Sequence, residues 1–221
     1  MGNSLSDTNG PNGSWTGYLA PPLAAAAITQ VGTAPLPAGG TRATTLTPTA
    51  PHVWLNNAHS GDSCLEMIAS GKAAAMVALK PDIVFWCFFG RNCVVGRLGG
   101  GSPSRATCAA NHLSIAQAIV ASGAQLLMTS PVCEGELFPD GANANDTELD
   151  AQDTIQATAA SAAGAQYLSV RAPHFTRMAI VNPGNTPTGH DTSDGVHLWS
   201  AGSGGQQWAA GLVLAQCGFT A

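Results

Sequence analysis

The chain has 221 residues, a length that suits one α/β domain with a well-buried core, so we expect a single domain over residues 1–221. Apolar residues make up 45% of the sequence and charged residues only 10%, which excludes a chain that is disordered as a whole. Because 8 Lys and Arg stand against 13 Asp and Glu, with no basic stripe to neutralise phosphates, nucleic acid is not an expected partner.

Short apolar segments alternate with alanine-rich stretches, a pattern typical of strands separated by helices in a parallel sheet. The predicted strands are near-continuously apolar and rich in Val, Ile, Leu or aromatic residues, as suits strands buried on both faces. In chain order they are His52–Asn56, Asp82–Phe89, Gln125–Ser130 and Gln166–Val170. Within them we expect Trp54, Phe85 and Trp86 to contribute to the core.

The predicted helices lie between and after these strands, and loops are expected where Gly, Pro, Asn and Thr cluster. The helices are Ser63–Leu79, His112–Ser122, Glu148–Ala163 and Gly204–Ala215. The loops are Gly32–Pro51, Gly96–Ser104, Glu134–Thr147 and Asn182–Ser193. Most of the long loops follow strands, where open α/β sheets bind their ligands.

The apolar runs are short throughout the chain. The longest, Ile83–Phe89 and Ala209–Ala215, fall far below the roughly 20 residues of a membrane-spanning helix, so no membrane span is expected. Met1 leads directly into Gly2 without a basic and apolar leader, so no targeting segment is visible. The compartment stays open, and a secreted or periplasmic location is favoured only if a leader has been removed.

The six cysteines show no C-x-x-C spacing and no histidine at zinc-finger distance, so no metal site is expected. They are Cys64, Cys87, Cys93, Cys108, Cys133 and Cys217. Nor do the histidines outside the motifs below have partners at metal-ligand spacing; these are His59, His112, His174 and His190. Disulfides in an oxidising compartment and buried free thiols remain equally open interpretations.

Two short motifs stand at opposite ends of the chain. Gly2-Asn3-Ser4 places a serine in a turn of small residues, and Asp194 stands three residues before His197. A hydrolytic base needs a carboxylate on one ring nitrogen to fix its tautomer, and the other nitrogen then takes the proton of the serine. Taken alone, the first motif is more often an exposed turn and the second a capped helix start.

Two further motifs follow predicted strands. The run from Asn57 to Ser63 contains Gly61, and the run Gly90-Arg91-Asn92-Cys93 follows the most apolar strand. A glycine amide and an asparagine side chain held at the ends of strands can donate hydrogen bonds to the oxyanion of a tetrahedral intermediate. Each motif by itself is equally an ordinary turn.

In this order the four motifs resemble the blocks of the SGNH/GDSL hydrolase family, over Gly2 to about Trp208. The family's usual Gly-Asp-Ser resembles Gly2–Ser4, and its Asn followed by Ser-Gly-Asp-Ser/Thr resembles Asn57–Ser63. Its Gly-x-Asn-Asp, after a Lys-Pro-Asp strand, resembles Gly90–Cys93, and its Asp-x-x-His resembles Asp194–His197.

The resemblance implies roles for individual residues. Ser4 would be the nucleophile, His197 the base and Asp194 its orienting carboxylate. The backbone amides of Ser4 and Gly61 and the side chain of Asn92 would form the oxyanion hole. The implied fold is a flavodoxin-like, three-layer α/β/α sandwich around a central parallel sheet of about five strands, and no cofactor is implied.

The activity implied by the resemblance is hydrolysis of small acyl esters, chiefly acetyl and on carbohydrate, through an acyl-enzyme on Ser4. The expected partner is therefore a small-molecule or glycan ester. Thioesterase, lysophospholipase or acyl-transfer activity on the same site remains open, as does the oligomeric state. Asn3 and Cys93 replace the family's usual Asp residues, which also leaves open a binding module without catalysis.

Two further expectations concern the nucleophile. In the family it follows a central strand, which is absent before Gly2, so either a preceding segment has been lost or another fills the slot, such as Met178–Val181 or Gly211–Leu214. Ser63, in Gly61-Asp62-Ser63, spells the first block more faithfully than Ser4 does. The order of the blocks favours Ser4, and the hydroxyl of Ser63 is expected to cap the following helix.

Overall fold

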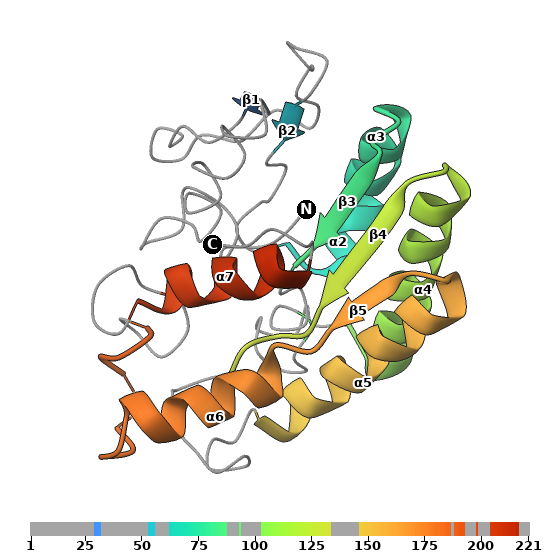
Figure 1. Ribbon diagram of the computed structural model, residues 1–221. Coiled ribbons are helices and arrows are strands. Elements are labelled where there is room, and N and C mark those ends of the chain that lie inside the picture. The colour runs from blue at the N-terminus through green and yellow to red at the C-terminus, as the bar shows by residue number, and fades with distance from the viewer. Residues whose placement is uncertain are drawn as a thin grey trace.

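The protein is described by a computed structural model that covers residues 29–31, 53–55, 62–87, 93, 103–133, 146–186, 188–192, 198 and 204–216. The strands are β1 Thr29–Val31, β2 Val53–Leu55, β3 Ile83–Trp86, β4 Gln125–Thr129 and β5 Gln166–Leu168. The helices are α2 Cys64–Ala69, α3 Lys72–Ala78, α4 Arg105–Ala121, α5 Asp146–Ala163, α6 Arg171–Val181 and α7 Gly205–Gln216. Figure 1 shows their arrangement.

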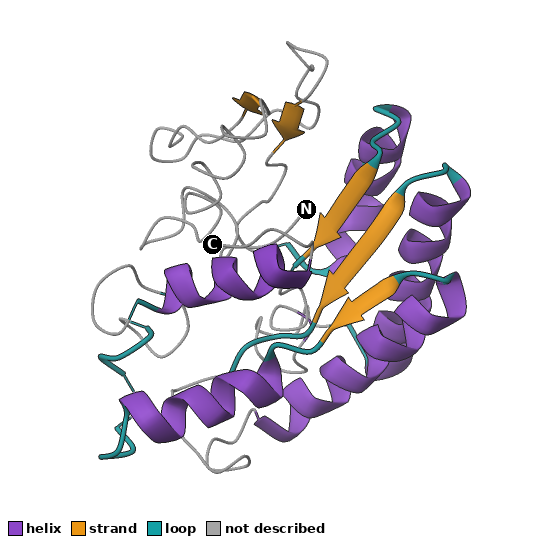
Figure 2. Ribbon diagram, in the orientation of Figure 1, coloured by secondary structure: helices purple, strands orange, loops and turns teal. Residues whose placement is uncertain are grey.

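Every strand pair described is parallel. The larger sheet has the order β3-β4-β5, with Ile83 opposite Gln125 and Leu127 opposite Gln166. The smaller sheet pairs β1 with β2, with Thr29 opposite Val53. Figure 2 shows the three arrows of the larger sheet running in one direction, so their carboxyl ends lie at the same edge. The four strands predicted from the sequence are confirmed.

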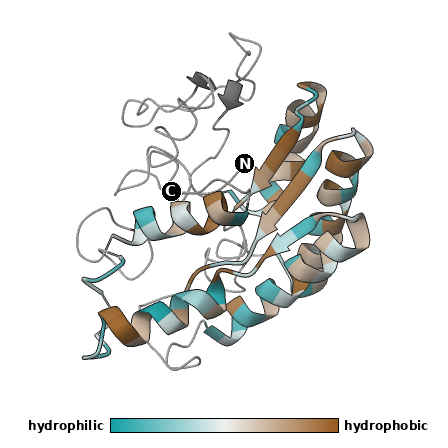
Figure 3. Cartoon of the chain, in the orientation of Figure 1, coloured by the Kyte–Doolittle hydropathy of each residue, from teal (hydrophilic) through white to brown (hydrophobic). Residues whose placement is uncertain are grey.

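Side chains of the larger sheet alternate between two buried clusters. Val84 and Trp86 of β3 pack with residues of α2, α4 and α5, whereas Phe85 and Cys87 pack with residues of α7. Hydrophobic residues are concentrated along β3 and β4 (Figure 3). Helices therefore cover both faces, and the predicted three-layer α/β/α sandwich is confirmed. None of the described helices is long and apolar enough to cross a bilayer.

The predicted helices are present, with shifted boundaries. The segment Ser63–Leu79 forms two helices, because Gly71 between them has a φ of 70°, in the left-handed region. Helix α4 begins before the predicted His112, since the Ser104 side chain accepts a hydrogen bond from the Thr107 amide and caps the helix there. Helix α6 was not predicted as a helix.

The segments suggested for the central slot are helical, so that prediction was wrong. Met178–Val181 lies in α6 and Gly211–Leu214 lies in α7, where both contribute to helix packing. Among the residues that the structure describes, β2 and β3 belong to different sheets. Which strand precedes the predicted nucleophile stays a question outside the described residues.

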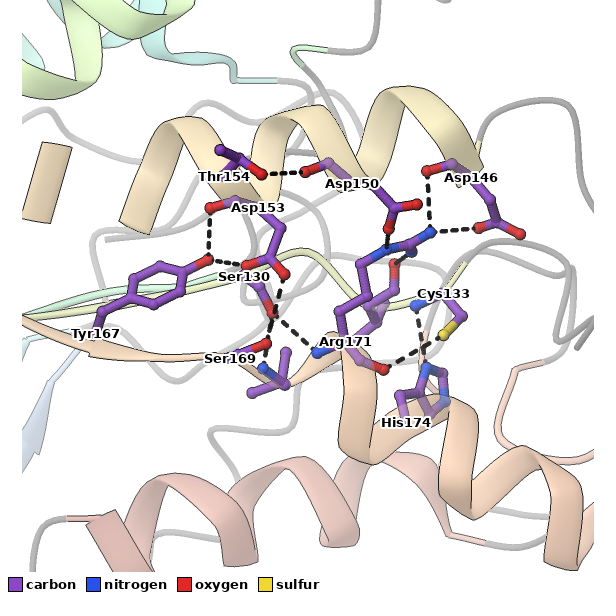
Figure 4. A network of polar contacts seen from close by, with 12 residues as sticks. Ser130, Cys133, Asp146, Asp150, Asp153, Thr154, Tyr167, Ser169, Arg171 and His174 are labelled. Carbon is purple, nitrogen blue, oxygen red and sulfur yellow. Dashed lines mark hydrogen bonds and ion pairs between the residues drawn. The ribbon is translucent and has the colours of Figure 1, made fainter. Parts of the chain in front are cut away.

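An ion-pair network, buried at Arg171 and Asp146, joins the starts of α5 and α6 (Figure 4). Arg171 Nη2 donates to Asp146 Oδ1 at 2.9 Å, and its Nε donates to Asp150. The hydroxyl of Ser130, just after β4, accepts the amides of Val170 and Arg171 at 2.7 and 2.9 Å. These contacts hold the start of α6 against the carboxyl end of the sheet.

Replacing Arg171 with methionine is expected to lower the free energy of unfolding by about 3–5 kcal/mol, the usual loss when one partner of a buried ion pair is removed. The side chain of Asp146 is 0% exposed and would lose its cation. The control is Arg105→Met, whose partner Glu148 forms a surface pair, and it should change stability little. Urea unfolding followed by circular dichroism measures both; equal losses would contradict the prediction.

Candidate active site

The residues assigned to catalysis lie outside the described residues, and their neighbours in the chain locate the segments that carry them. These residues are Ser4, Gly61, Asn92, Asp194 and His197. Described neighbours exist for all of them except Ser4.

The segments that carry Gly61 and Asn92 meet in the structure. Cys64, three residues after Gly61, opens α2, and Cys93 directly follows Asn92. Their sulfur atoms lie 3.3 Å apart, and both side chains are 0% exposed. Two of the motifs that resemble family blocks therefore belong to one region, although the cysteines are 29 residues apart in sequence.

The segment that carries Asp194 and His197 is framed by described residues on both sides. Thr192 and Leu198 form an antiparallel bridge, so the two ends of this short segment lie side by side. Leu198 belongs to the same buried cluster as Cys87, just after β3, and its carbonyl oxygen accepts a 2.9 Å hydrogen bond from Gln206 Nε2. Leu198 therefore packs in a cluster that includes Cys87 and Val132, which follow β3 and β4 in the chain, at the edge where open α/β folds place their sites.

A buried carboxylate anchors the same segment. Asp191 is 0% exposed and receives both the Nε and Nη2 groups of Arg177, from α6. His174 Nε2 lies 3.5 Å from its Oδ2. Burial acts to raise the pKa of Asp191, but hydrogen bonds from His174 and Arg177 outweigh it and lower that pKa. The carboxylate is therefore ionised. Its ion pair with Arg177 holds the chain just before the Asp194–His197 motif against α6.

His174 and Asp191 resemble the histidine–carboxylate pair of a catalytic site, but both side chains are buried, so a substrate cannot reach the ring. His174 Nδ1 accepts the amide of Cys133 at 3.1 Å, so its proton sits on Nε2 and faces Asp191. The ring is 0% exposed and stacks on Trp208, with centroids 4.9 Å apart. Because the ring is fully buried and its Nδ1 accepts the Cys133 amide, His174 has a structural role and is not placed to act as a base for a substrate.

Gly205, at the start of α7, allows this helix to pack closely against the backbone of Asp191. A Cβ at position 205 would lie 2.4 Å from the carbonyl oxygen of Asp191, closer than real Cβ atoms approach other atoms. The two backbones are therefore in contact only because residue 205 is glycine.

Gly205→Ala is expected to displace α7 or the segment of Asp191, and so to lower both thermal stability and turnover. The control is Gly211→Ala in the same helix, where a Cβ would meet nothing within 4 Å and should raise stability by up to about 1 kcal/mol. Thermal denaturation and steady-state kinetics of both variants check this. A Gly205→Ala protein as stable and active as Gly211→Ala would contradict the close contact.

Ser63 has the role of a helix cap. Its hydroxyl accepts the Leu65 amide at 3.1 Å, and the Glu66 carboxylate accepts the Ser63 amide at 2.9 Å, which completes a capping box. Ser63 is 0% exposed. Its predicted capping role is confirmed, and the buried hydroxyl is committed to the start of α2.

A cluster of soft ligand atoms adjoins the same region, which the sequence analysis did not find. Cys93 Sγ lies 4.0 Å from His112 Nε2, and these atoms and Cys64 Sγ all lie within 4.8 Å of one another. Burial lowers the pKa of His112 to about 4, so its ring is neutral at pH 7. No spacing along the chain indicated this cluster, because Cys93 stands 29 residues from Cys64 and 19 residues from His112.

Comparison with known proteins shows which solved structures share this fold. No family model and no curated protein matches the sequence. Among solved structures, Axe2, an acetylxylan esterase from Geobacillus stearothermophilus, aligns at 16% identity with a TM-score of 0.72, over 99% of this chain and 92% of its own. The acetyl xylan esterase AlAXEase aligns at 19% identity with a TM-score of 0.65, over 74% of this chain and 81% of its own.

A third structure, LAE5, is described as an alpha/beta hydrolase enzyme from the metagenome of Lake Arreo in Spain. It aligns at 18% identity with a TM-score of 0.56, over 75% of this chain and 73% of its own. At these identities the comparison establishes the fold. The chain shares the α/β fold of these esterase structures, as its sequence predicts.

Proposed function

We propose that the protein is a serine esterase that removes small acyl groups, chiefly acetyl, from carbohydrate. Support comes from the shared fold with acetyl xylan esterases and from the order of the four motifs. Two of the Axe2 structures are described as catalytic mutants, one with a serine and one with an aspartate changed to alanine. The same residue types stand in this chain as Ser4 and Asp194.

In the proposed mechanism, Ser4 attacks the carbonyl carbon of the ester while His197 takes its proton and Asp194 steadies the imidazolium. The amides of Ser4 and Gly61 and the side chain of Asn92 stabilise the negative oxygen. His197 then protonates the departing alcohol. A water molecule, activated by the same ring, releases the acyl group from Ser4.

A contact between two motif-bearing segments supports this proposal. Cys64, directly after the second motif, lies against Cys93, the last residue of the third, with their sulfur atoms 3.3 Å apart. Acyl transfer needs an oxyanion donor and a base at a common carbon, so groups from distant segments must meet.

Covalent labelling followed by substrate profiling tests the proposal. A fluorophosphonate probe should modify wild-type protein at Ser4, identified by peptide mass spectrometry, and leave Ser4→Ala unlabelled. Acetylated xylo-oligosaccharides, p-nitrophenyl esters of rising chain length and acyl-CoA then compare acyl and alcohol groups. Failure to label any serine would indicate a binding module, and preference for long acyl esters or thioesters would contradict the proposed substrate class.

Activity is expected to rise with pH through a value of about 6.5–7, the ordinary range for an imidazole. His197 must be neutral to accept the proton of Ser4, and it is protonated below that range, so the rate falls on the acid side. A pH profile of kcat/KM on p-nitrophenyl acetate measures this. A profile without an acid limb would remove His197 from the role of base.

A further inference from the structure

Three separate elements bring sulfur and imidazole groups together beside the segment of Asn92. Cys64 is the first residue of α2, Cys93 follows Asn92, and His112 lies in the middle of α4. All three side chains are 0% exposed, and their ligand atoms lie within 4.8 Å of one another. Nothing in the proposed ester hydrolysis uses these groups.

Cys108 adds a fourth group of the same kind. It stands one helical turn before His112 on α4 and is also 0% exposed. Its sulfur lies 3.9 Å from the carbonyl oxygens of Cys93 and Pro103, beside the cluster. Three sulfurs and one imidazole nitrogen form the donor set of a known class of closed, four-coordinate zinc sites.

Two distances between the ligand atoms are close to those of a zinc tetrahedron. Zinc–sulfur and zinc–nitrogen bonds of about 2.3 and 2.05 Å place two sulfurs about 3.8 Å apart, and a sulfur and a nitrogen about 3.6 Å apart. The Cys64–Cys93 and Cys93–His112 distances are 3.3 and 4.0 Å, each within about 0.5 Å of those values. A disulfide would need a sulfur–sulfur distance of about 2.05 Å, which is a larger change.

A polar side chain lies against the cluster. Gln152 Nε2 donates to the carbonyl oxygen of Cys93 at 3.3 Å. This hydrogen bond holds the backbone of one proposed ligand in place, as outer hydrogen bonds do around metal sites.

We propose that Cys64, Cys93 and His112 bind one zinc ion, and that the neighbouring Cys108 turns its thiol to the ion as the fourth ligand of a closed structural site. Binding forms three zinc–sulfur bonds and one zinc–nitrogen bond, and the three thiols release their protons to solvent. The ion would tie the residue after Asn92 to the start of α2 and to α4. The proposal does not depend on esterase activity, because metal content is measured without a substrate.

The first measurement is the metal content of full-length protein, purified without chelators and analysed by mass spectrometry of the elements. The expected result is close to one zinc per chain. Replacing zinc with Co²⁺ should produce a sulfur-to-cobalt charge-transfer band and the intense visible bands of tetrahedral coordination. Both results use the wild-type chain, so they do not depend on whether a variant folds.

Matched variants locate the ion. Cys93→Ser and His112→Gln should lose the bound zinc and the cobalt charge-transfer band, whereas Cys133→Ser should keep both. Cys133 is equally buried, but its sulfur contacts the carbonyl oxygen of Arg171 at 3.7 Å, away from the cluster. Circular dichroism of each variant reports whether the fold is kept.

Two results would overturn the proposal. Zinc retained in Cys93→Ser would place the ion elsewhere. Wild-type protein without zinc, and without a cobalt–thiolate band, would leave plain thiols or a Cys64–Cys93 disulfide. Titration of thiols in denaturant separates these, because the disulfide leaves two fewer reactive thiols and a mass lower by two hydrogens.

Discussion

Ser4→Ala is expected to lower turnover of an activated ester by several orders of magnitude, because no other group would form the acyl-enzyme. The residual rate would come from binding and oxyanion stabilisation alone. Thermal stability should change little, since the proposal assigns Ser4 a chemical role. The measurement is kcat on p-nitrophenyl acetate, with the melting temperature as the check on folding.

Ser63→Ala is the matched control, because Gly61-Asp62-Ser63 is the competing match to the nucleophile motif. Removing this cap should cost about 1 kcal/mol of stability, the usual loss for a helix N-cap. Turnover should be largely kept, since the hydroxyl is 0% exposed and accepts the Leu65 amide. An inactive Ser63→Ala beside an active Ser4→Ala would reverse the assignment of the nucleophile.

Asn92→Ala is expected to lower turnover by roughly a hundred- to a thousand-fold, the usual loss for one oxyanion donor, with the fold kept. The loss should appear in kcat more than in KM, because the hydrogen bond strengthens as charge develops on the oxygen.

The control for this variant is Asn182→Ala, which also removes an asparagine amide. Asn182 is 0% exposed and holds a turn, donating to the carbonyl of Thr186 at 2.7 Å and accepting its amide at 3.0 Å. Its loss should reduce stability and leave kcat nearly unchanged. Full turnover in a folded Asn92→Ala protein would mean that Asn92 is only a turn residue.

Local patterns in the sequence determined much of the fold. Continuous apolar runs predicted β3, β4 and β5, and the serine before Cys64 predicted the cap of α2. The break at Gly71 was also present in the sequence but was missed, because the apolar periodicity continues across it. Helix α6 was missed because Arg171 and His174, which read as surface residues, are buried by partners on other elements.

The sequence also determined which residues are candidates for catalysis, through the order of four motifs along the chain. Only the tertiary structure decided that Cys64, Cys93 and His112 form one cluster, and that Leu198 packs with Cys87. Propensity and periodicity act over a few residues, whereas these contacts join elements through parallel pairing and the packing of helices on the sheet. Spacing along the chain therefore could not reveal them.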